Sequence, residues 1–298
     1  MTGKCLVHIP MPGPVSAVAF AEGDRQFVTC HDNFGTNVDA AIYIFDFNKE
    51  DPSSSSTKPS IPPITNPDCP REKITRVDWL PLNDGILASL ENGQLRIYNP
   101  KTGKLISQHS GHTDKITSFS FNDKKTLLVT ASKDRTAKLW DVKEMKVLRS
   151  YQADVPLNGA SISPIREHVI AGGGQEAMNV TTTQASAGKF ETRFYHMIFE
   201  KELGRVRGHF GPINTLAFHP DGQSFTSGAE DGYLRMHRLD SDYFALGDED
   251  NLDDPVLTAA LNEGVMEQLE QEEAEEAAKE AELAKSKSSS SSSNAVNK

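Results

Sequence analysis

The sequence of 298 residues predicts an all-β fold built from repeats, and three observations carry this prediction. Short runs in which apolar and polar residues alternate recur along the chain, with the period of a half-buried strand. Turn-forming residues follow most of these runs within three positions. A short polar or amide side chain then stands eighteen positions after the start of every run. Units that recur in this way along a chain are typical of a propeller or a solenoid.

Five alternating runs are the predicted first strands of the repeat, and their starts lie 59, 42, 41 and 56 residues apart. They are Val15–Phe20, Ile74–Trp79, Ile116–Phe121, Leu157–Ile162 and Ile213–Phe218. The two short intervals match the ~40–45 residues of a four-stranded β-propeller blade. The residues eighteen positions after each start are Asn33, Asn92, Asp134, Gln175 and Asp231.

Further strands are expected after each run. Second strands are predicted at Gln26–Cys30, Gly85–Leu90, Leu127–Ser132, His168–Gly172 and Ser224–Ser227. Third strands are predicted at Leu95–Tyr98, Ala137–Val142 and Tyr233–Leu239, and fourth strands at Leu105–His109, Val147–Gln152 and Leu203–Arg207. The two long intervals are attributed to insertions. One is the Ser/Pro-rich loop Asp51–Pro63, and the other is the aromatic stretch 182–202, which we expect to fold against the propeller.

Composition excludes several classes of protein. Hydrophobic residues make up 37% of the chain, mean hydropathy is -0.48, and no run approaches the 18 apolar residues of a membrane helix. The net charge of -11 is concentrated at the end, because residues 245–298 hold 14 acidic and 4 basic residues. The remainder is nearly neutral, which disfavours direct nucleic-acid binding. The unpatterned cysteines and the absence of a secretory signal favour a cytoplasmic protein.

One unit carries a set of polar residues typical of the WD repeat. Gly-His precedes the first strand at His112, and Ser132, Asp134 and Trp140 complete a predicted structural tetrad of hydrogen-bonded side chains. A second Gly-His/Asp pair, His209 and Asp231, shows the same separation of 22 residues. Such a network satisfies polar groups that would each cost ~1–3 kcal/mol if buried unpaired.

The same polar residues could also belong to a catalytic or metal site, but the sequence lacks the motifs that such sites need. His112, Ser132 and Asp134 have the composition of a hydrolase triad, but the G-x-S-x-G elbow is missing. Gly172–Gly174 is followed by no Lys-Ser/Thr pair, so we expect a turn instead of a phosphate loop. The histidines show no metal-ligand spacing. We therefore expect no enzyme activity, no metal and no cofactor.

The second half of the chain resembles one particular WD-repeat family. The runs Gly172–Thr183, Gly188–His196, Phe199–Gly222 and Gly228–Arg235 resemble the i subunit of eukaryotic translation initiation factor three, also described as a TGF-beta receptor interacting protein. The resemblance extends over about Val15–Phe244. It implies a WD40 β-propeller that acts as a non-catalytic scaffold in the complex supporting mRNA recruitment to, and scanning by, the small ribosomal subunit.

The family implies partners and a blade number. Its propeller docks the C-terminal helix of the b subunit and contacts the g subunit. It has seven blades, whereas five are visible here, so we expect the first two blades to be absent and the remainder to form an open arc. Three regions are expected: blades over residues 1–244, an acidic helical extension over 245–285, and a Ser-rich disordered tail over 286–298.

Three side chains are predicted to contact partners. Asp123 follows the first strand of the third unit and Asp141 ends its third strand, so both are expected on one rim, where they would receive a basic or capped helix. Gln175 occupies the slot of Asp134 and Asp231 within the family run, which suggests a second contact. Two alternatives to the initiation subunit remain open: a signalling adaptor that binds a receptor kinase, and a propeller hydrolase.

Overall fold

The computed structural model describes residues 5, 7–32, 39–48, 57–65, 72–174 and 190–245. The chain divides into two compact units, Met1–Leu239 and Asp240–Lys298. In the second unit the described part holds one short helix, α1 (Ser241–Ala245). The predicted acidic extension beyond Ala245 and the predicted Ser-rich tail lie outside the described residues.

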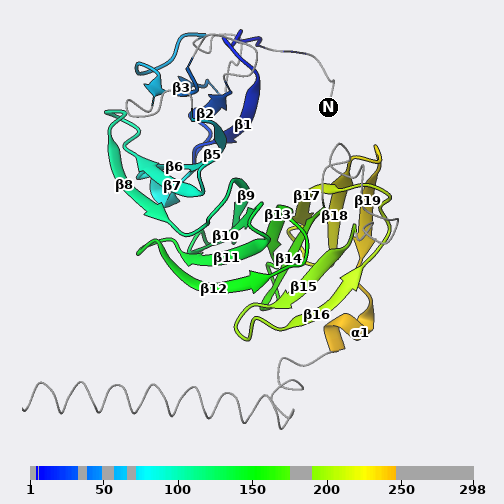
Figure 1. Cartoon of the computed structure of the whole chain (residues 1–298). Helices are drawn as coiled ribbons and strands as arrows, with labels where there is room; N and C mark the ends of the chain where they lie inside the picture. The colour runs from blue at the N-terminus through cyan, green and yellow to red at the C-terminus, as the bar shows by residue number, and fades with distance from the viewer. Residues whose placement is uncertain are drawn as a thin grey trace, which may run out of the picture. The chain divides into compact units, whose positions relative to one another are not determined.

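The first unit is all-β and consists of five antiparallel sheets that follow one another along the chain (Figure 1). Four sheets have four strands each and the fifth has three among the described residues. The first sheet comprises β1 (Val15–Phe20), β2 (Gln26–His31), β3 (Ala41–Asp46) and β4 (Ile64–Thr65), and the second β5 (Ile74–Trp79), β6 (Ile86–Leu90), β7 (Gln94–Tyr98) and β8 (Leu105–Ser110). The third comprises β9 (Ile116–Phe121), β10 (Leu127–Ser132), β11 (Thr136–Asp141) and β12 (Lys146–Gln152), and the fourth β13 (Leu157–Ile162), β14 (His168–Gly173), β15 (Thr192–His196) and β16 (Glu202–Val206). The fifth comprises β17 (Ile213–Phe218), β18 (Ser224–Ala229) and β19 (Leu234–Arg238).

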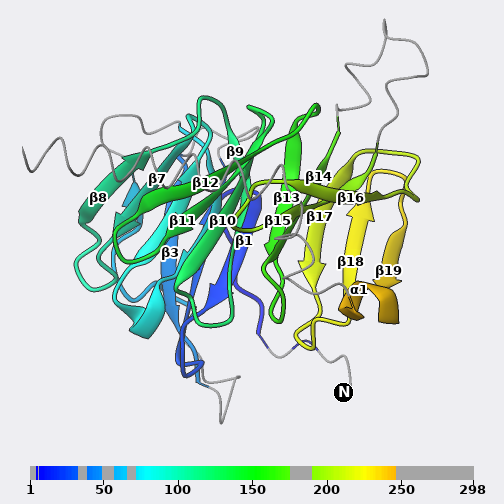
Figure 2. The same ribbon diagram turned by 90° about the horizontal axis from the view of Figure 1, so that it is seen from below.

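Within every sheet the strands pair in chain order, so their turns gather at two opposite ends (Figure 2). We call the end with the turns between first and second and between third and fourth strands the lower rim. The upper rim carries the turn between second and third strands, together with the connection to the next sheet. The five predicted first strands have the observed bounds of β1, β5, β9, β13 and β17.

The insertion predicted at 182–202 is wrong over residues 192–196 and at residue 202, and its residues 182–189 lie outside the described ones. Part of the stretch 182–202 is the strand β15, which pairs with β14 on one side and with β16 on the other. All five residues of β15 are buried. A strand that is covered on both faces shows no alternation of apolar and polar residues, and this is why its period was invisible in the sequence.

The core lies between neighbouring sheets. Val28, Ile42 and Ile44 of the first sheet pack with Val77 and Trp79 of the second. Similar clusters join the second sheet to the third and the third to the fourth. Between the fourth and fifth sheets the rings of Phe194 and Phe225 meet edge to face at 5.4 Å. Each sheet is therefore stabilised by burial against the next one.

Side chains of the first strands also bind the backbone of the neighbouring first strand. The Trp79 indole donates to the carbonyl of Ala19 at 3.2 Å, and the Ser120 hydroxyl donates to the carbonyl of Ala160 at 3.0 Å. The Asn158 amide donates to the carbonyl of Ile213 at 2.9 Å. These bonds hold the sheets in sequence, and the row of sheets does not close into a ring in the described residues (Figure 1).

The fixed eighteen-residue spacing has a structural cause at the upper rim. The polar side chain that stands eighteen positions after the start of each first strand accepts a hydrogen bond from the backbone amide two residues later. This bond closes the turn between the second and third strands. The pairs are Asn92 with Gln94, Asp134 with Thr136 and Asp231 with Tyr233, at 3.0, 2.9 and 3.0 Å. Asn33 and Gln175, the remaining two, lie outside the described residues.

Candidate functional site: polar networks and the lower rim

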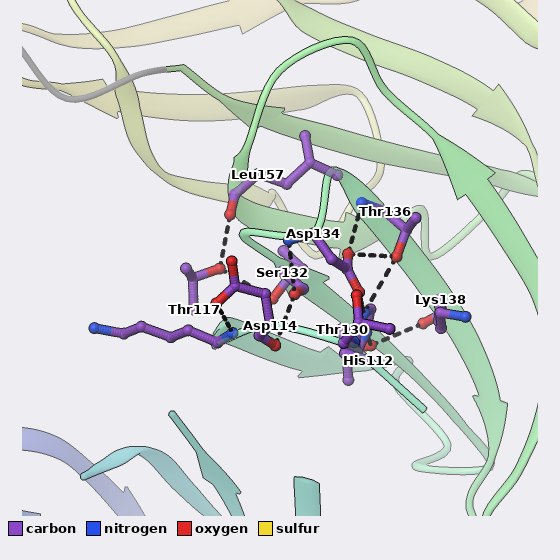
Figure 3. Close-up of polar contacts among 12 residues, drawn as sticks. His112, Asp114, Thr117, Thr130, Ser132, Asp134, Thr136, Lys138 and Leu157 are labelled. Carbon is purple, nitrogen blue, oxygen red and sulfur yellow. Dashed lines mark hydrogen bonds and ion pairs between the residues drawn. The ribbon is translucent and has the colours of Figure 1, made fainter. Parts of the chain in front are cut away.

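One polar network spans the third sheet, and Figure 3 shows its central part. Nδ1 of His112 lies 2.8 Å from Oδ2 of Asp134, and Nε2 of His112 lies 2.7 Å from the hydroxyl of Thr130. The indole of Trp140 donates to the same hydroxyl at 2.9 Å. Four side chains thus form one continuous hydrogen-bonded chain inside the blade.

The carboxylate of Asp134 fixes the proton positions in this network. It accepts hydrogen bonds from the amide and hydroxyl of Thr136 and from the amide of Thr113. Burial raises the pKa of Asp134, but these bonds and the contact with His112 outweigh it and lower the pKa. An ionised carboxylate only accepts, so Nδ1 of His112 carries the hydrogen and Nε2 accepts from Thr130.

The imidazole of His112 is buried, and this burial lowers its pKa despite the nearby carboxylate of Asp134. The neutral ring has one donor and one acceptor, and both are used. A base that is fully hydrogen-bonded inside the sheet has no face left for a substrate. The geometry therefore favours a structural role for this network over a catalytic one.

Ser132 does not take the predicted place in the tetrad. Its hydroxyl donates to the carbonyl of Asp114 at 3.1 Å and accepts from the amide of Asp134 at 3.1 Å. The reason is the strand register: Trp140 lies opposite Leu128, two residues from Thr130 but four from Ser132. At about 3.3 Å per residue, the indole reaches Thr130 and stops short of Ser132. The Ser–His contact that a hydrolase triad requires is replaced by these backbone bonds.

The fifth sheet repeats the network with serine in place of threonine and histidine in place of tryptophan. Nδ1 of His209 lies 3.0 Å from Oδ2 of Asp231, and Nε2 lies 2.8 Å from the hydroxyl of Ser227. Nε2 of His237 approaches the same hydroxyl at 3.2 Å and occupies the position of the tryptophan. The pKa of Asp231 is lowered to about 2, because amide and imidazole hydrogen bonds outweigh the effect of burial.

Sequence reasoning missed Thr130, Ser227 and His237. A signal for the hydroxyls was present, since each stands four residues before the aspartate of its own blade. Two residues before the aspartate, the third sheet has Ser132 but the fifth has Ala229. A comparison of the two blades at equal offsets would have selected Thr130.

The structure places Asp123 and Asp141 at the lower rim of the third sheet. The amide of Asn122, next to Asp123, donates to the carbonyl of Leu127, and Leu127 pairs with Asp141. The two turns therefore flank the start of β10. Asp123 is exposed, whereas Asp141 is half-buried and accepts the amide of Glu144 at 2.8 Å. Gln175 lies outside the described residues.

The lower rim of the first two sheets is hollowed. A cavity of about 640 Å³ is lined by residues of both sheets, among them Ile61, Trp79 and Leu82. Leu82 has a φ of 57° and is 79% exposed, so a large apolar side chain stands in the turn after β5.

Neither a metal-binding cluster nor a membrane-spanning helix is present among the described residues. Within these ranges, no three His, Cys, Asp or Glu side chains are arranged to hold a metal ion. No described helix has the length and hydropathy needed to cross a membrane.

Successive four-stranded antiparallel sheets, two of them with His–Asp–hydroxyl networks, define a WD-repeat protein of the β-propeller class. The EIF3I family model matches residues 1–249, so the chain belongs to the EIF3I family. It is 44% identical over 243 residues to the protein of Taeniopygia guttata named eukaryotic translation initiation factor 3 subunit I, covering 82% of this chain and 73% of the relative. Two further relatives carry the same name. The protein of Xenopus tropicalis is 50% identical, over 59% of this chain and 54% of the relative. The protein of Candida albicans is 41% identical, over 81% of this chain and 71% of the relative.

Proposed function

We propose that the chain is a non-catalytic scaffold subunit of the eukaryotic translation initiation factor 3 complex in the cytoplasm. In this role it supports recruitment of mRNA to the small ribosomal subunit, and scanning, through protein–protein contacts. The observation that carries the proposal is the family match over residues 1–249. The polar networks support it, because their histidines and hydroxyls are committed to bonds within the sheets.

The lower rim is the proposed docking surface for the other subunits. Asp123 and Asp141 supply carboxylates in adjacent turns, and Lys124 and Lys143 stand beside them in the same turns. A partner helix with basic residues would place its charges on the aspartates, where charge-assisted hydrogen bonds form. We propose the C-terminal helix of the b subunit for this position. Gln175 is proposed for a second contact, and the g subunit for a further partner of the chain.

Affinity purification of the tagged 298-residue chain from a eukaryotic cell extract tests the function. The expected result is stoichiometric recovery of the other initiation factor 3 subunits. Recovery of a receptor kinase without those subunits would favour the signalling-adaptor hypothesis instead. Labelling of a serine in the purified chain by an active-site serine probe would contradict the non-catalytic role.

A further inference from the structure

The cavity at the lower rim of the first two sheets is lined by residues that are fixed by hydrogen bonds. Trp79 lines it and is buried, and its indole donates to the carbonyl of Ala19. Ile61 also lines it, next to Ser60, whose amide donates to the carbonyl of Ile44 at 2.7 Å. A pocket whose lining is held in place in this way can accept a ligand without the cost of ordering it first.

Leu82 stands beside this cavity in a backbone conformation that leucine rarely adopts. Its φ is 57° and that of Asn83 is 58°, in the left-handed region where a Cβ crowds the following carbonyl oxygen. Leu82 is also 79% exposed, so within this chain its side chain gains little from burial. Strained backbone of this kind concentrates at functional sites.

The strained turn is held in place by the neighbouring sheet. The amide of Glu22 donates to Oδ1 of Asn83 at 2.9 Å, and Nδ2 of Asn83 donates to the carbonyl of Glu22 at 3.0 Å. The amide of Leu82 donates to Oε2 of Glu22 at 3.3 Å. Three hydrogen bonds from outside the turn therefore hold an exposed apolar side chain next to the cavity.

The cavity is continuous with the part of the lower rim that carries Asp123. Nζ of Lys125, two residues after Asp123, donates to the carbonyl of Trp79 at 2.9 Å. The turn that presents Asp123 is thus bonded directly to a residue that lines the cavity. A helix that docks on Asp123 and continues toward the first two sheets would meet the cavity and Leu82.

The charge of this rim indicates which occupant fits. Each of the first three sheets presents an exposed carboxylate in the turn between its first and second strands, and these are Glu22, Asp84 and Asp123. Among the described residues, Asp84 and Lys101 are the charged side chains that line the cavity. Basic residues on a helix would be attracted to the row of carboxylates.

Segments of the chain itself do not meet these requirements. Residues 245–298 hold 14 acidic and 4 basic residues, so they would bring like charges to the carboxylates. Residues 49–56, which precede the lining residue Ser60, read Lys-Glu-Asp-Pro-Ser-Ser-Ser-Ser and contain no large apolar side chain. A second copy that docked through the same rim would place carboxylates opposite carboxylates. The observations thus favour a basic helix of a different protein.

We propose that Ile61, Trp79 and Leu82 form an anchor pocket for a large apolar side chain on the partner helix that also docks on Asp123 and Asp141. The inference rests on the proposed function for the identity of that helix and extends its contact to the first two sheets. The carboxylates orient the helix, and the apolar side chain in the anchor pocket slows its dissociation.

The probe is the C-terminal helix of the b subunit from the same organism, made as a fluorescein-labelled peptide. Its affinity for the 298-residue chain is measured by fluorescence anisotropy, and the contact is located by amide hydrogen exchange. We expect saturable binding, with slower exchange of amides in the turns at residues 80–85 and 122–126. Binding that leaves exchange in the turn at 80–85 unchanged would overturn the proposal.

The variant Leu82→Asn tests the apolar contact. Its affinity for the peptide should fall about tenfold, as expected for the loss of one buried leucine side chain. Asparagine tolerates the left-handed conformation better than leucine, so the urea midpoint should not fall and misfolding is excluded. Phe210→Asn is the matched control, because Phe210 is 84% exposed at the upper rim, and it should bind as the unaltered chain does. Equal affinity of Leu82→Asn and the unaltered chain would refute the anchor pocket.

A second pair of measurements separates the anchor pocket from the docking surface on which it rests. Loss of peptide binding in both Asp123→Lys/Asp141→Lys and Leu82→Asn supports both. Loss in the double lysine variant alone keeps the docking surface and refutes the anchor pocket. Loss in Leu82→Asn alone supports the anchor pocket and refutes docking on the aspartates. Binding that neither variant weakens refutes both, as does the absence of binding to the unaltered chain.

Other occupants are tested in the full chain. The variant Leu257→Asp/Leu261→Asp, in the acidic segment, should leave the affinity for the peptide unchanged. A tenfold gain that disappears when Leu82→Asn is added would show that the acidic segment of the chain occupies the pocket, and would overturn the proposal. A dimer seen by light scattering that dissociates in Leu82→Asn would show that a second copy occupies it, with the same consequence.

Discussion

Nδ1 of His112 lies 2.8 Å from Oδ2 of Asp134, and the two side chains are 0% and 8% exposed. His209 and Asp231 repeat this contact at 3.0 Å with the same separation of 22 residues. In each blade the pair joins the connection from the preceding sheet to the turn between second and third strands. Two segments of the upper rim are therefore held together by one buried hydrogen bond.

Thr130, and not Ser132, should couple energetically to His112. The variant Thr130→Val should lower the free energy of unfolding by ~1–3 kcal/mol, because it leaves the polar groups of His112 and Trp140 without their shared partner. Double-mutant cycles with His112→Ala measure the coupling free energy between His112 and a second residue. We expect about 1 kcal/mol for Thr130, and a value within ~0.5 kcal/mol of zero for Ser132. Urea unfolding measures both cycles. A larger coupling for Ser132 would contradict the observed network.

Stability should fall as the pH drops below about 6.5. Burial lowers the pKa of His112 in the folded chain, so the unfolded chain, in which histidine titrates near 6.5, binds more protons in the interval between the two values. The pKa values of Asp134 and Asp231 are also lowered, the latter to about 2, so a second loss should begin near pH 4. Urea midpoints between pH 7.5 and 3 measure both losses. In the variant His112→Gln, the urea midpoint should depend less steeply on pH near pH 6. An unchanged dependence would exclude His112 as the source of the loss of stability.

Charge reversal at the lower rim should prevent capture of the b-subunit helix. The variant Asp123→Lys/Asp141→Lys should reduce recovery of that subunit about tenfold or more, because like charges would face each other at the contact. Asp114→Lys, at the upper rim of the same sheet, is the matched control. Asp141→Asn keeps an oxygen for the amide of Glu144 and separates loss of charge from loss of the turn. Unchanged recovery with the double lysine variant would reject the site.

Two glycines with the same backbone conformation should differ in their tolerance of alanine. Gly93 and Gly232 have φ values of 82° and 80°, which disfavour any side chain. A Cβ at Gly232 would meet nothing within 4 Å, whereas a Cβ at Gly93 would lie 2.5 Å from the backbone oxygen of His112. We expect Gly232→Ala to cost ~1 kcal/mol and Gly93→Ala clearly more. Equal urea midpoints for the two variants would show that the second and third sheets do not approach closely at Gly93.

Among the first strands, β9 and β17 have one packed face and one less buried face, which is the contrast that makes an alternating run recognisable, whereas β13 is buried throughout and was recognised by its place in the repeat. The strand β15 was not predictable, since full burial removes the period that marks a strand. In the network, His112 and Asp134 were found by spacing, whereas Thr130 and Ser132 share one face of β10 and differ only in cross-strand register. Register depends on which residues pair across the sheet, so within one blade the sequence does not separate Thr130 from Ser132, and only a comparison with the fifth sheet does.

The core clusters described above are each shared by two consecutive sheets. A sheet can therefore bury its apolar face as soon as the next one has left the ribosome, with no need to wait for the end of the chain. Synthesis from the N-terminus would add one interface at a time, in the order in which the sheets are encoded. The Trp79–Ala19 bond, within the first of these interfaces, would then be among the earliest long-range contacts that the nascent polypeptide makes.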